Sequence, residues 1–314
     1  MFPIADLHCD VLCKLARNPA LAFEAAEEGT SGLDVTRRRL ADGGVDLQVF
    51  AVYVPEDLPL RPESALREAE LFWSQVLAAP GMKLVRQASD LEEARKNGQT
   101  AALLSLEGAD SLQGQWWALR LLHRLGLRLL GPTWNRANWA CDGATEPRGA
   151  GLTQDGRRLV RECEETGILV DVSHLSERGF WDVAELAARP FFASHSNARA
   201  VRDHPRNLTD DQIRAIVAVD GLVGVTFVPW FLTDREPARI DDVLRHVEHI
   251  CGLGAENHLA FGSDFDGIDR HVEGLAHPGE YPALAEALLA RYPEPLVRGF
   301  LGGNARRFFT RNLP

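Results

Sequence analysis

The sequence predicts an α/β protein, a (β/α)8 barrel of the TIM type, in a single domain that spans residues 1–314. Two observations lead to this prediction. Short apolar, β-branched runs alternate with segments of helical periodicity, and the 314 residues contain eight such runs. Alternation of strands and helices is typical of a parallel sheet, and this length suits one barrel. A doubly wound open sheet is the alternative that a strand count alone leaves open.

The expected strands follow one another along the chain, each ending in a polar loop. They are residues 3–10, 45–54, 101–110, 127–135, 167–174, 190–196, 221–228 and 258–267. Segments of helical spacing lie between them, clearest in 239–252, where apolar residues recur at i, i+3, i+4 and i+7 and Gly252 is placed to end the helix. Residues 155–167 and 175–189 show a similar pattern. His246 and His249 fall on the polar face of the 239–252 segment, so we expect both to be solvated.

The composition indicates a soluble cytoplasmic protein with no nucleic-acid or membrane partner. The formal net charge is -11, and no run of Lys and Arg suits a phosphate backbone. No stretch reaches the roughly eighteen uninterrupted apolar residues of a membrane span, and the N-terminus lacks the pattern of a signal peptide. The cysteines are odd in number and scattered, which favours reduced thiols (Cys9, Cys13, Cys141, Cys163 and Cys251).

Polar side chains stand at the carboxyl ends of the expected strands. In a barrel these ends meet on one face, where such enzymes build their active sites. We therefore expect one shared pocket for residues that are far apart in sequence: His8, Asp10, Glu107, Trp134, Asn135, His174, His195 and Asp264.

The residue types in this set indicate a binuclear metal centre. In an extended strand His8 and Asp10 point to the same side while Cys9 points away. Imidazole and carboxylate ligands suit Zn²⁺, and a carboxylate can bridge two ions. Glu107 is the natural bridge, because it stands at a strand end between the His8–Asp10 pair and the later His174 and His195. The predicted cofactors are two Zn²⁺ ions, although other divalent metals are compatible with these ligands.

A hydrolytic centre of this kind also needs a group that carries a proton. Asp264 and Asp266 in "GSDFDG" both offer a carboxylate, and the spacing prefers Asp264 only slightly, because it is nearer the strand end. Asp266 fits better as a loop cap before Gly267.

Five motifs in this chain resemble those of the membrane dipeptidase (renal dipeptidase, peptidase M19) family. They are "DLHCD", "SLEGAD", "DVSHLS", "ASHSNARAV" followed by "HPRNLTDDQI", and "FGSDFDG", in this order between residue 4 and about residue 310. The resemblance implies an amidohydrolase-like (β/α)8 barrel. It also implies a binuclear zinc centre that hydrolyses dipeptides, including those with a D-residue at the C-terminal position, through a hydroxide that bridges the metals.

The resemblance also assigns roles to individual residues. It places His8 and Asp10 on the first zinc, His174 and His195 on the second, and Glu107 between them. Asp264 matches the catalytic aspartate of the family. Arg206 matches the arginine that binds the free carboxylate of the substrate, a role that suits the bidentate guanidinium.

One position departs from the family pattern. Where mammalian members have "LTHN", this chain has "PTWN", so Trp134 replaces a histidine that contacts the substrate and helps to stabilise the oxyanion. Indole has a single N–H donor and a larger body. Asn135 or zinc takes over this task, or Trp134 shapes the pocket.

Two other functions remain open at this point. One is a different binuclear metallohydrolase on the same barrel, such as a lactonase, an ester hydrolase or an N-acyl amino acid hydrolase. The other is a metal-binding homologue without activity, which Trp134 alone would favour. The sequence does not identify the dipeptide, because specificity lies in the loops. The family resemblance favours a homodimer.

Overall fold

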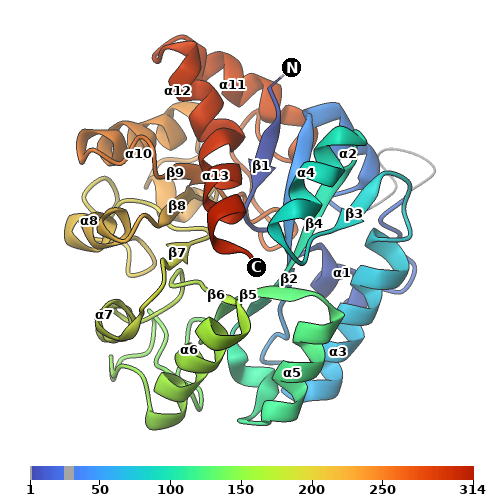
Figure 1. Ribbon diagram of the computed structural model, residues 1–314. Helices are drawn as coiled ribbons and strands as arrows, with labels where there is room; N and C mark the ends of the chain where they lie inside the picture. Colours follow the sequence, from blue (N-terminus) through green and yellow to red (C-terminus); the bar gives the residue numbers. More distant parts are fainter. Residues whose placement is uncertain (1, 25–31) are drawn as a thin grey trace.

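The computed structural model describes residues 2–24 and 32–314, in which parallel strands form a barrel surrounded by helices (Figure 1). The hydrogen-bonded order is β6-β5-β4-β2-β1-β9-β8-β7, and every pairing between strands is parallel. The strands are β1 (Ile4–Asp6), β2 (Val45–Val52), β3 (Met82–Leu84), β4 (Thr100–Glu107), β5 (Leu127–Gly131), β6 (Leu169–Val170), β7 (Phe192–Ala193), β8 (Leu222–Val225) and β9 (Leu259–Phe261).

A single bridge closes the ring between β6 and β7. Asp171 pairs with Phe192 in parallel, and the amide of Val172 donates to the Phe192 carbonyl at 2.8 Å. The ring of eight strands confirms the predicted (β/α)8 barrel and rules out the doubly wound sheet. The eight predicted runs correspond to the ring strands, but β3 was missed; it pairs outside the ring with the first residues of β4.

The helices lie around the ring and follow the predicted alternation (Figure 1). The predicted helices at 155–167, 175–189 and 239–252 correspond to α6, α7 and α10. The helices are α1 (Val11–Arg17), α2 (Arg37–Gly43), α3 (Pro62–Leu71), α4 (Ala88–Lys96), α5 (Trp116–Leu125), α6 (Gln154–Thr166), α7 (Glu177–Leu186), α8 (Asp210–Ala218), α9 (Pro229–Leu232), α10 (Ile240–Gly252), α11 (Tyr281–Leu289), α12 (Glu294–Arg298) and α13 (Asn304–Asn312). Short 3-10 or π segments are η1 (Phe72–Val76), η2 (Ala109–Leu112), η3 (Pro278–Glu280) and η4 (Gly299–Gly303).

Alternate residues of the strands build two cores. In β2, Leu47 and Val49 pack in the barrel interior, whereas Phe50 and Val52 pack in the layer between the sheet and the helices. The interior cluster takes at least one residue from each of the eight ring strands (Ala5, Leu47, Leu103, Leu129, Leu169, Phe192, Leu222 and Ala260). The barrel is therefore a packed core, and only its ends are available for a site.

Helix α13 covers the end of the barrel where the strands begin. Phe308 and Phe309 join the interior cluster, with ring centroids 5.6 and 6.2 Å from that of Phe192 at the start of β7. The C-terminus accordingly lies near the middle of the ring in Figure 1. The opposite end, where the strands finish, is left for the site.

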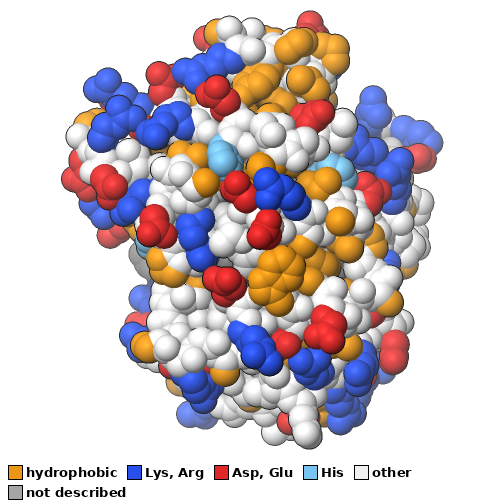
Figure 2. Space-filling view, turned by 90° about the vertical axis from the view of Figure 1, so that its left-hand side faces the viewer, with side chains coloured by type: hydrophobic (Ala, Val, Ile, Leu, Met, Phe, Trp, Pro, Cys, Tyr) orange, Lys and Arg blue, Asp and Glu red, His pale blue; other side chains and the backbone are white. Residues whose placement is uncertain are grey.

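The surface shows no separation of charge on the face seen in Figure 2, where acidic and basic side chains are interspersed and hydrophobic side chains form separate groups. Within residues 2–24 and 32–314, no helix has the length and apolar character needed to cross a membrane. All five cysteines are free thiols.

The prediction that His246 is solvated is wrong. Its ring is fully buried, and Nδ1 accepts a hydrogen bond from the Ala198 amide while Nε2 donates to the Leu232 carbonyl, each at 3.1 Å. The helical periodicity was correct, but the loop after β7 and helix α9 cover this face of α10. His249 is half-buried and pairs with Asp210 at 2.7 Å.

We expect Phe309→Ala to destabilise the barrel without changing the residues at the opposite end. Phe309 is fully buried, and truncation of a buried Phe costs about 3–5 kcal/mol. Urea unfolding would measure the loss, with Trp117→Ala as control, because Trp117 is 46% exposed and its replacement should change the stability by no more than about 0.5 kcal/mol. Equal stability of Phe309→Ala and the wild type would contradict the role of α13.

Candidate metal centre

The predicted ligands meet at the carboxyl ends of the ring strands. Glu107 is the last residue of β4, His8 and His195 follow β1 and β7 by two residues, and Asp264 follows β9 by three. His174 stands four residues after β6. The regular strand β1 is shorter than expected, but hydrogen bonds from Leu7 to Phe261 and from Ala51 to Cys9 continue the pairing and fix the chain near His8.

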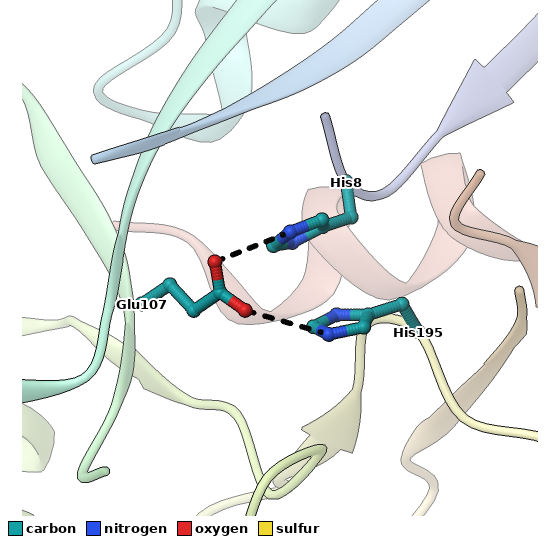
Figure 3. Close-up of side chains that lie close together, drawn as sticks. All are labelled: His8, Glu107 and His195. Atoms are coloured by element: carbon teal, nitrogen blue, oxygen red, sulfur yellow. Dashed lines mark ion pairs between the residues drawn. The ribbon is translucent and has the colours of Figure 1, made fainter. Parts of the chain in front are cut away.

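The carboxylate of Glu107 lies in the centre of this cluster (Figure 3). Its Oε2 atom is 3.5 Å from His8 Nε2. Its Oε1 atom is 2.6 Å from His174 Nε2 and 3.6 Å from His195 Nε2. The two oxygens therefore face different histidines, as the prediction of a bridging residue requires.

Two groups of potential ligands flank Glu107. In ligand group A, His8 Nε2 lies 3.3 Å from Asp10 Oδ2 and 3.9 Å from Asp264 Oδ1. In ligand group B, the Nε2 atoms of His174 and His195 are 2.8 Å apart. The structure thus brings together all five predicted metal ligands and adds Asp264 to the atoms around His8. Cys9 is absent from both groups, because its buried thiol donates to the Val49 carbonyl.

Unpaired buried atoms show that a cation fits this cluster. Within the described residues, His8 Nε2 and Asp10 Oδ1 are buried without a hydrogen-bond partner. Such an atom costs about 1–3 kcal/mol, or more when it belongs to a charged group, unless another species satisfies it. Imidazole nitrogens and carboxylate oxygens are ligands that divalent transition metals prefer. The donor set therefore fits a divalent metal ion.

The electrostatics of the cluster also favour a cation. Burial raises the pKa of Asp10 well above its usual value, and the charge of Glu107 adds to this effect. Burial opposes the charge on Glu107 too, but His8 and His174 hold its pKa well below the usual value. Burial would likewise lower the pKa of His8, yet Glu107 and Asp10 raise it well above the ordinary value. Carboxylates that favour a proton on His8 Nε2 also favour a metal cation beside it.

The surroundings of the histidines in ligand group B favour their neutral form. Burial and the charge of Arg206 lower the pKa of His174 to about 4. Burial, together with His8 and His174, holds the pKa of His195 well below its usual value. A neutral imidazole is the form that binds a metal.

Asn135 orients His174, a contact that the sequence did not reveal. His174 Nδ1 donates to Asn135 Oδ1 at 3.0 Å, which leaves Nε2 with a lone pair directed at Glu107. Metal-binding histidines are commonly held by such an acceptor on their second nitrogen. The sequence analysis placed Asn135 at the substrate; in the structure its oxygen is engaged by a predicted ligand.

The two aspartates of "GSDFDG" have different surroundings. Asp264 reaches ligand group A from backbone with φ 68°, and burial raises the pKa of its carboxyl group. Gly267 makes room here, because a Cβ atom on it would lie 2.4 Å from Asp264 Oδ1. Asp266 instead accepts from the amides of Asp34 and Val35 at 2.8 and 2.9 Å and pairs with Lys14. The expectation that Asp266 is a structural cap agrees with these contacts.

A cavity of about 470 Å³ opens over the cluster. Arg206 lines it but is only 2% exposed, and its Nη1 and Nη2 atoms donate to the carbonyls of Ser173 and His195. One wall contains Tyr53 and Trp134, whose ring centroids are 5.1 Å apart. A separate apolar cluster also lines the cavity and was not predicted as a unit (Val228, Trp230, Phe231 and Ile268).

A family model described as membrane dipeptidase (peptidase family M19) matches residues 1–312. The chain belongs to the membrane dipeptidase family. A solved metallopeptidase of family M19, dipeptidase AC, is 37% identical with a TM-score of 0.92, covering 99% of both chains. A metallopeptidase from Rhodobacter sphaeroides, solved with a phosphinate mimic of the dipeptide L-Ala-D-Ala, is 35% identical with a TM-score of 0.91 and 99% coverage of both.

Curated relatives include longer proteins. Dipeptidase tcpJ from Claviceps purpurea (strain 20.1) is 35% identical over 214 residues, which are 67% of this chain and 50% of that protein. The chain thus spans about half the length of this relative. The resemblance to membrane dipeptidases is confirmed, and membership of this metallopeptidase family implies a divalent metal.

We expect Glu107→Gln to lose bound metal, because glutamine cannot present two anionic oxygens to the two ligand groups. Elemental analysis of dialysed, metal-loaded protein would measure the metal per chain. Glu68→Gln is a matched control: Glu68 is only 2% exposed, burial raises its pKa well above the usual value, and its carboxylate accepts from the Tyr53 amide instead of contacting a predicted ligand. Metal content equal to that of the wild type in Glu107→Gln would contradict the assignment.

Proposed function

We propose that this membrane dipeptidase relative is a zinc-dependent dipeptidase that hydrolyses free dipeptides, including those with a D-residue at the C-terminal position. The observation that carries the proposal is the position of Glu107 between two ligand groups, with Arg206 in the same cavity. The relative solved with a mimic of L-Ala-D-Ala supports the choice of substrate. A cavity of about 470 Å³ lies within the usual range for small ligands.

The proposed cofactors are two Zn²⁺ ions. His8 and Asp10 would hold one, His174 and His195 the other, and Glu107 both, a set of nitrogen and oxygen ligands that suits zinc. When bound, such a pair of ions supplies a hydroxide at neutral pH and polarises the peptide carbonyl.

Asp264 holds and transfers the proton in this proposal. Its carboxylate lines the cavity beside His8, and its raised pKa brings it closer to neutrality, where a general acid or base is most effective. The proton would pass through this carboxyl group to the amine that leaves.

Arg206 recognises the free carboxylate of the substrate. Burial lowers its pKa to about 10, so it stays cationic at neutral pH, and its Nε atom has no hydrogen-bond partner within the described residues. A buried cation fixed on two carbonyls is prepared to pair with an anion. This feature favours free dipeptides over lactones, simple esters or an inactive homologue.

Trp134 shapes the pocket in place of the family histidine. Its ring packs on Tyr53 and lies 6.1 Å from the ring of His174. Asn135 is engaged through Oδ1, so its Nδ2 group is what remains to donate to a substrate oxygen.

We further propose a cytoplasmic homodimer. Free cysteines, four of them buried, suit a reducing compartment. The homodimer rests on the family resemblance alone.

The function is tested by amine release from a panel of L,L- and L,D-dipeptides with zinc-loaded protein. Cleavage of free dipeptides, without cleavage of N-acylated or amidated controls, is the expected result. No cleavage by metal-loaded protein, together with hydrolysis of lactones or esters, would contradict the proposal.

We expect Asp264→Asn to lower kcat by about 100-fold or more, because asparagine cannot carry a proton. Steady-state kinetics and metal content should be measured on the same sample. Retained metal with lost activity supports the proton-transfer role. Wild-type activity contradicts it, and loss of metal would make Asp264 a ligand instead.

We expect Arg206→Met to reduce kcat/KM for a free dipeptide by at least about 30-fold, which corresponds to about 2 kcal/mol. The matched control is the same dipeptide with an amidated C-terminus, for which the wild type and the variant should be equally poor. Loss of bound metal in the variant would give Arg206 a general structural role, and a wild-type kcat/KM on the free dipeptide would contradict the assignment.

A further inference from the structure

The carboxylate of Asp171 connects the two strand ends that carry His174 and His195. Asp171 Oδ1 accepts from the Ser173 amide at 3.0 Å, from Ser173 Oγ at 2.7 Å and from the Ser194 amide at 3.0 Å, and Asp171 Oδ2 accepts from Ser194 Oγ. The same residue forms the single bridge that closes the barrel between β6 and β7. Neither the motif roles nor the proposed mechanism uses this residue.

The directions of these hydrogen bonds determine the tautomer of His195. Ser194 Oγ has one hydrogen, and it is donated to Asp171 Oδ2. Ser194 Oγ therefore acts as acceptor toward His195 Nδ1, which lies 2.7 Å away. His195 then carries its hydrogen on Nδ1, and its Nε2 atom presents a lone pair to His174 Nε2 at 2.8 Å and to Glu107 Oε1 at 3.6 Å.

The arrangement of the Nε2 atoms of His174 and His195 is consistent with a cation between the two rings. His174 is held in the same tautomer by Asn135, so the Nε2 atoms of both rings carry lone pairs and lie 2.8 Å apart, with Arg206 Nη2 at 3.2 Å from that of His174. Two lone pairs at this distance repel one another, whereas both can point at a metal ion. The two histidines are therefore set as ligands by acceptors on their outer nitrogens, as is common for metal sites.

We propose that Asp171 is a positioning residue that acts through Ser194 to hold His195 in the tautomer whose Nε2 atom can bind a metal ion. The inference rests on the metal centre of the proposed function but not on the identity of the substrate. This positioning role differs from a purely structural one. It requires Asp171 to accept the hydrogen of Ser194 Oγ, whereas a structural role requires only that Asp171 keeps its hydrogen bonds.

Asp171→Asn separates these two roles. Asparagine has almost the same shape, and its Oδ1 atom can still accept from the amides of Ser173 and Ser194. Its Nδ2 group donates where the aspartate accepted, so Ser194 Oγ loses the acceptor for its hydrogen. The remaining acceptors are His195 Nδ1 at 2.7 Å and Ser173 Oγ at 3.2 Å, and we expect the hydrogen to turn to the nearer one, His195 Nδ1. With Nδ1 acting as the acceptor, His195 carries its own hydrogen on Nε2, where a metal ion would bind.

The experiment uses the full-length chain and two measurements. Long-range ¹H–¹⁵N NMR on metal-free protein labelled in histidine reports the tautomer of His195, and competition with a chelator reports Zn²⁺ affinity. We expect the wild type to be protonated on Nδ1 and Asp171→Asn on Nε2. Loss of a partner that orients a metal ligand typically weakens metal affinity by about 10- to 100-fold. We expect Asp171→Asn to lose Zn²⁺ affinity near the upper end of this range.

Two further variants keep the test decisive if Asp171→Asn folds poorly. Ser194→Ala removes the acceptor without reversing it, so its loss of affinity should be nearer to about 10-fold. Asp171→Asn combined with Ser194→Ala should recover affinity relative to Asp171→Asn alone. Asp142→Asn is the control, because Asp142 is also buried and accepts from the Ala150 amide and Arg148 but contacts neither histidine.

An unchanged His195 tautomer in Asp171→Asn would overturn the inference, as would wild-type Zn²⁺ affinity in both Asp171→Asn and Ser194→Ala. Failure of the proposed function gives a different result. If the wild type binds no divalent metal, the metal centre is wrong, while the NMR measurement on metal-free protein still decides whether Asp171 sets the tautomer.

Discussion

The contact between the Glu107 carboxylate and the histidines on both sides of it is the one on which the rest of the site depends. The side chain of Glu107, at the end of β4, is only 8% exposed, and histidines that follow β1, β6 and β7 approach its two oxygens. A buried carboxylate is costly unless cations or donors surround it. The barrel meets this condition by bringing strand ends far apart in the sequence around one side chain. The interior cluster below this end of the barrel is built from apolar side chains, whereas the strand ends bring the polar ligands together.

The weakest part of the ring lies under half of this site. Strands β6 and β7 have two residues each, and one bridge joins them. Side-chain hydrogen bonds from Ser173 and Ser194 to Asp171 add to this junction, and Arg206 donates to carbonyls on both sides of it. Closure of the barrel and orientation of ligand group B are therefore achieved by the same few residues. A change that loosens the junction would affect both together.

Much of the fold and the ligand set could be predicted, because both follow from local patterns. Apolar runs mark the ring strands, and polar residues at their carboxyl ends must meet once the ring closes. The prediction failed where tertiary packing decides. β3 is too short to be seen, and His246 is buried by segments remote in the sequence. Asn135 and Ser194 orient histidines through contacts that no spacing rule reveals, although Ser194 is adjacent to His195. The roles assigned to Asp264, Arg206 and Trp134 remain predictions. The structure shows only that all three residues line the cavity.

The central claim is that Glu107 stands between two metal ions. Anomalous diffraction from crystals of the full chain loaded with Zn²⁺, collected on both sides of the zinc absorption edge, tests it most directly. The account predicts two anomalous peaks, one beside each oxygen of Glu107, the first near His8 and Asp10 and the second near His174 and His195. A single peak, or peaks away from Glu107, would contradict it.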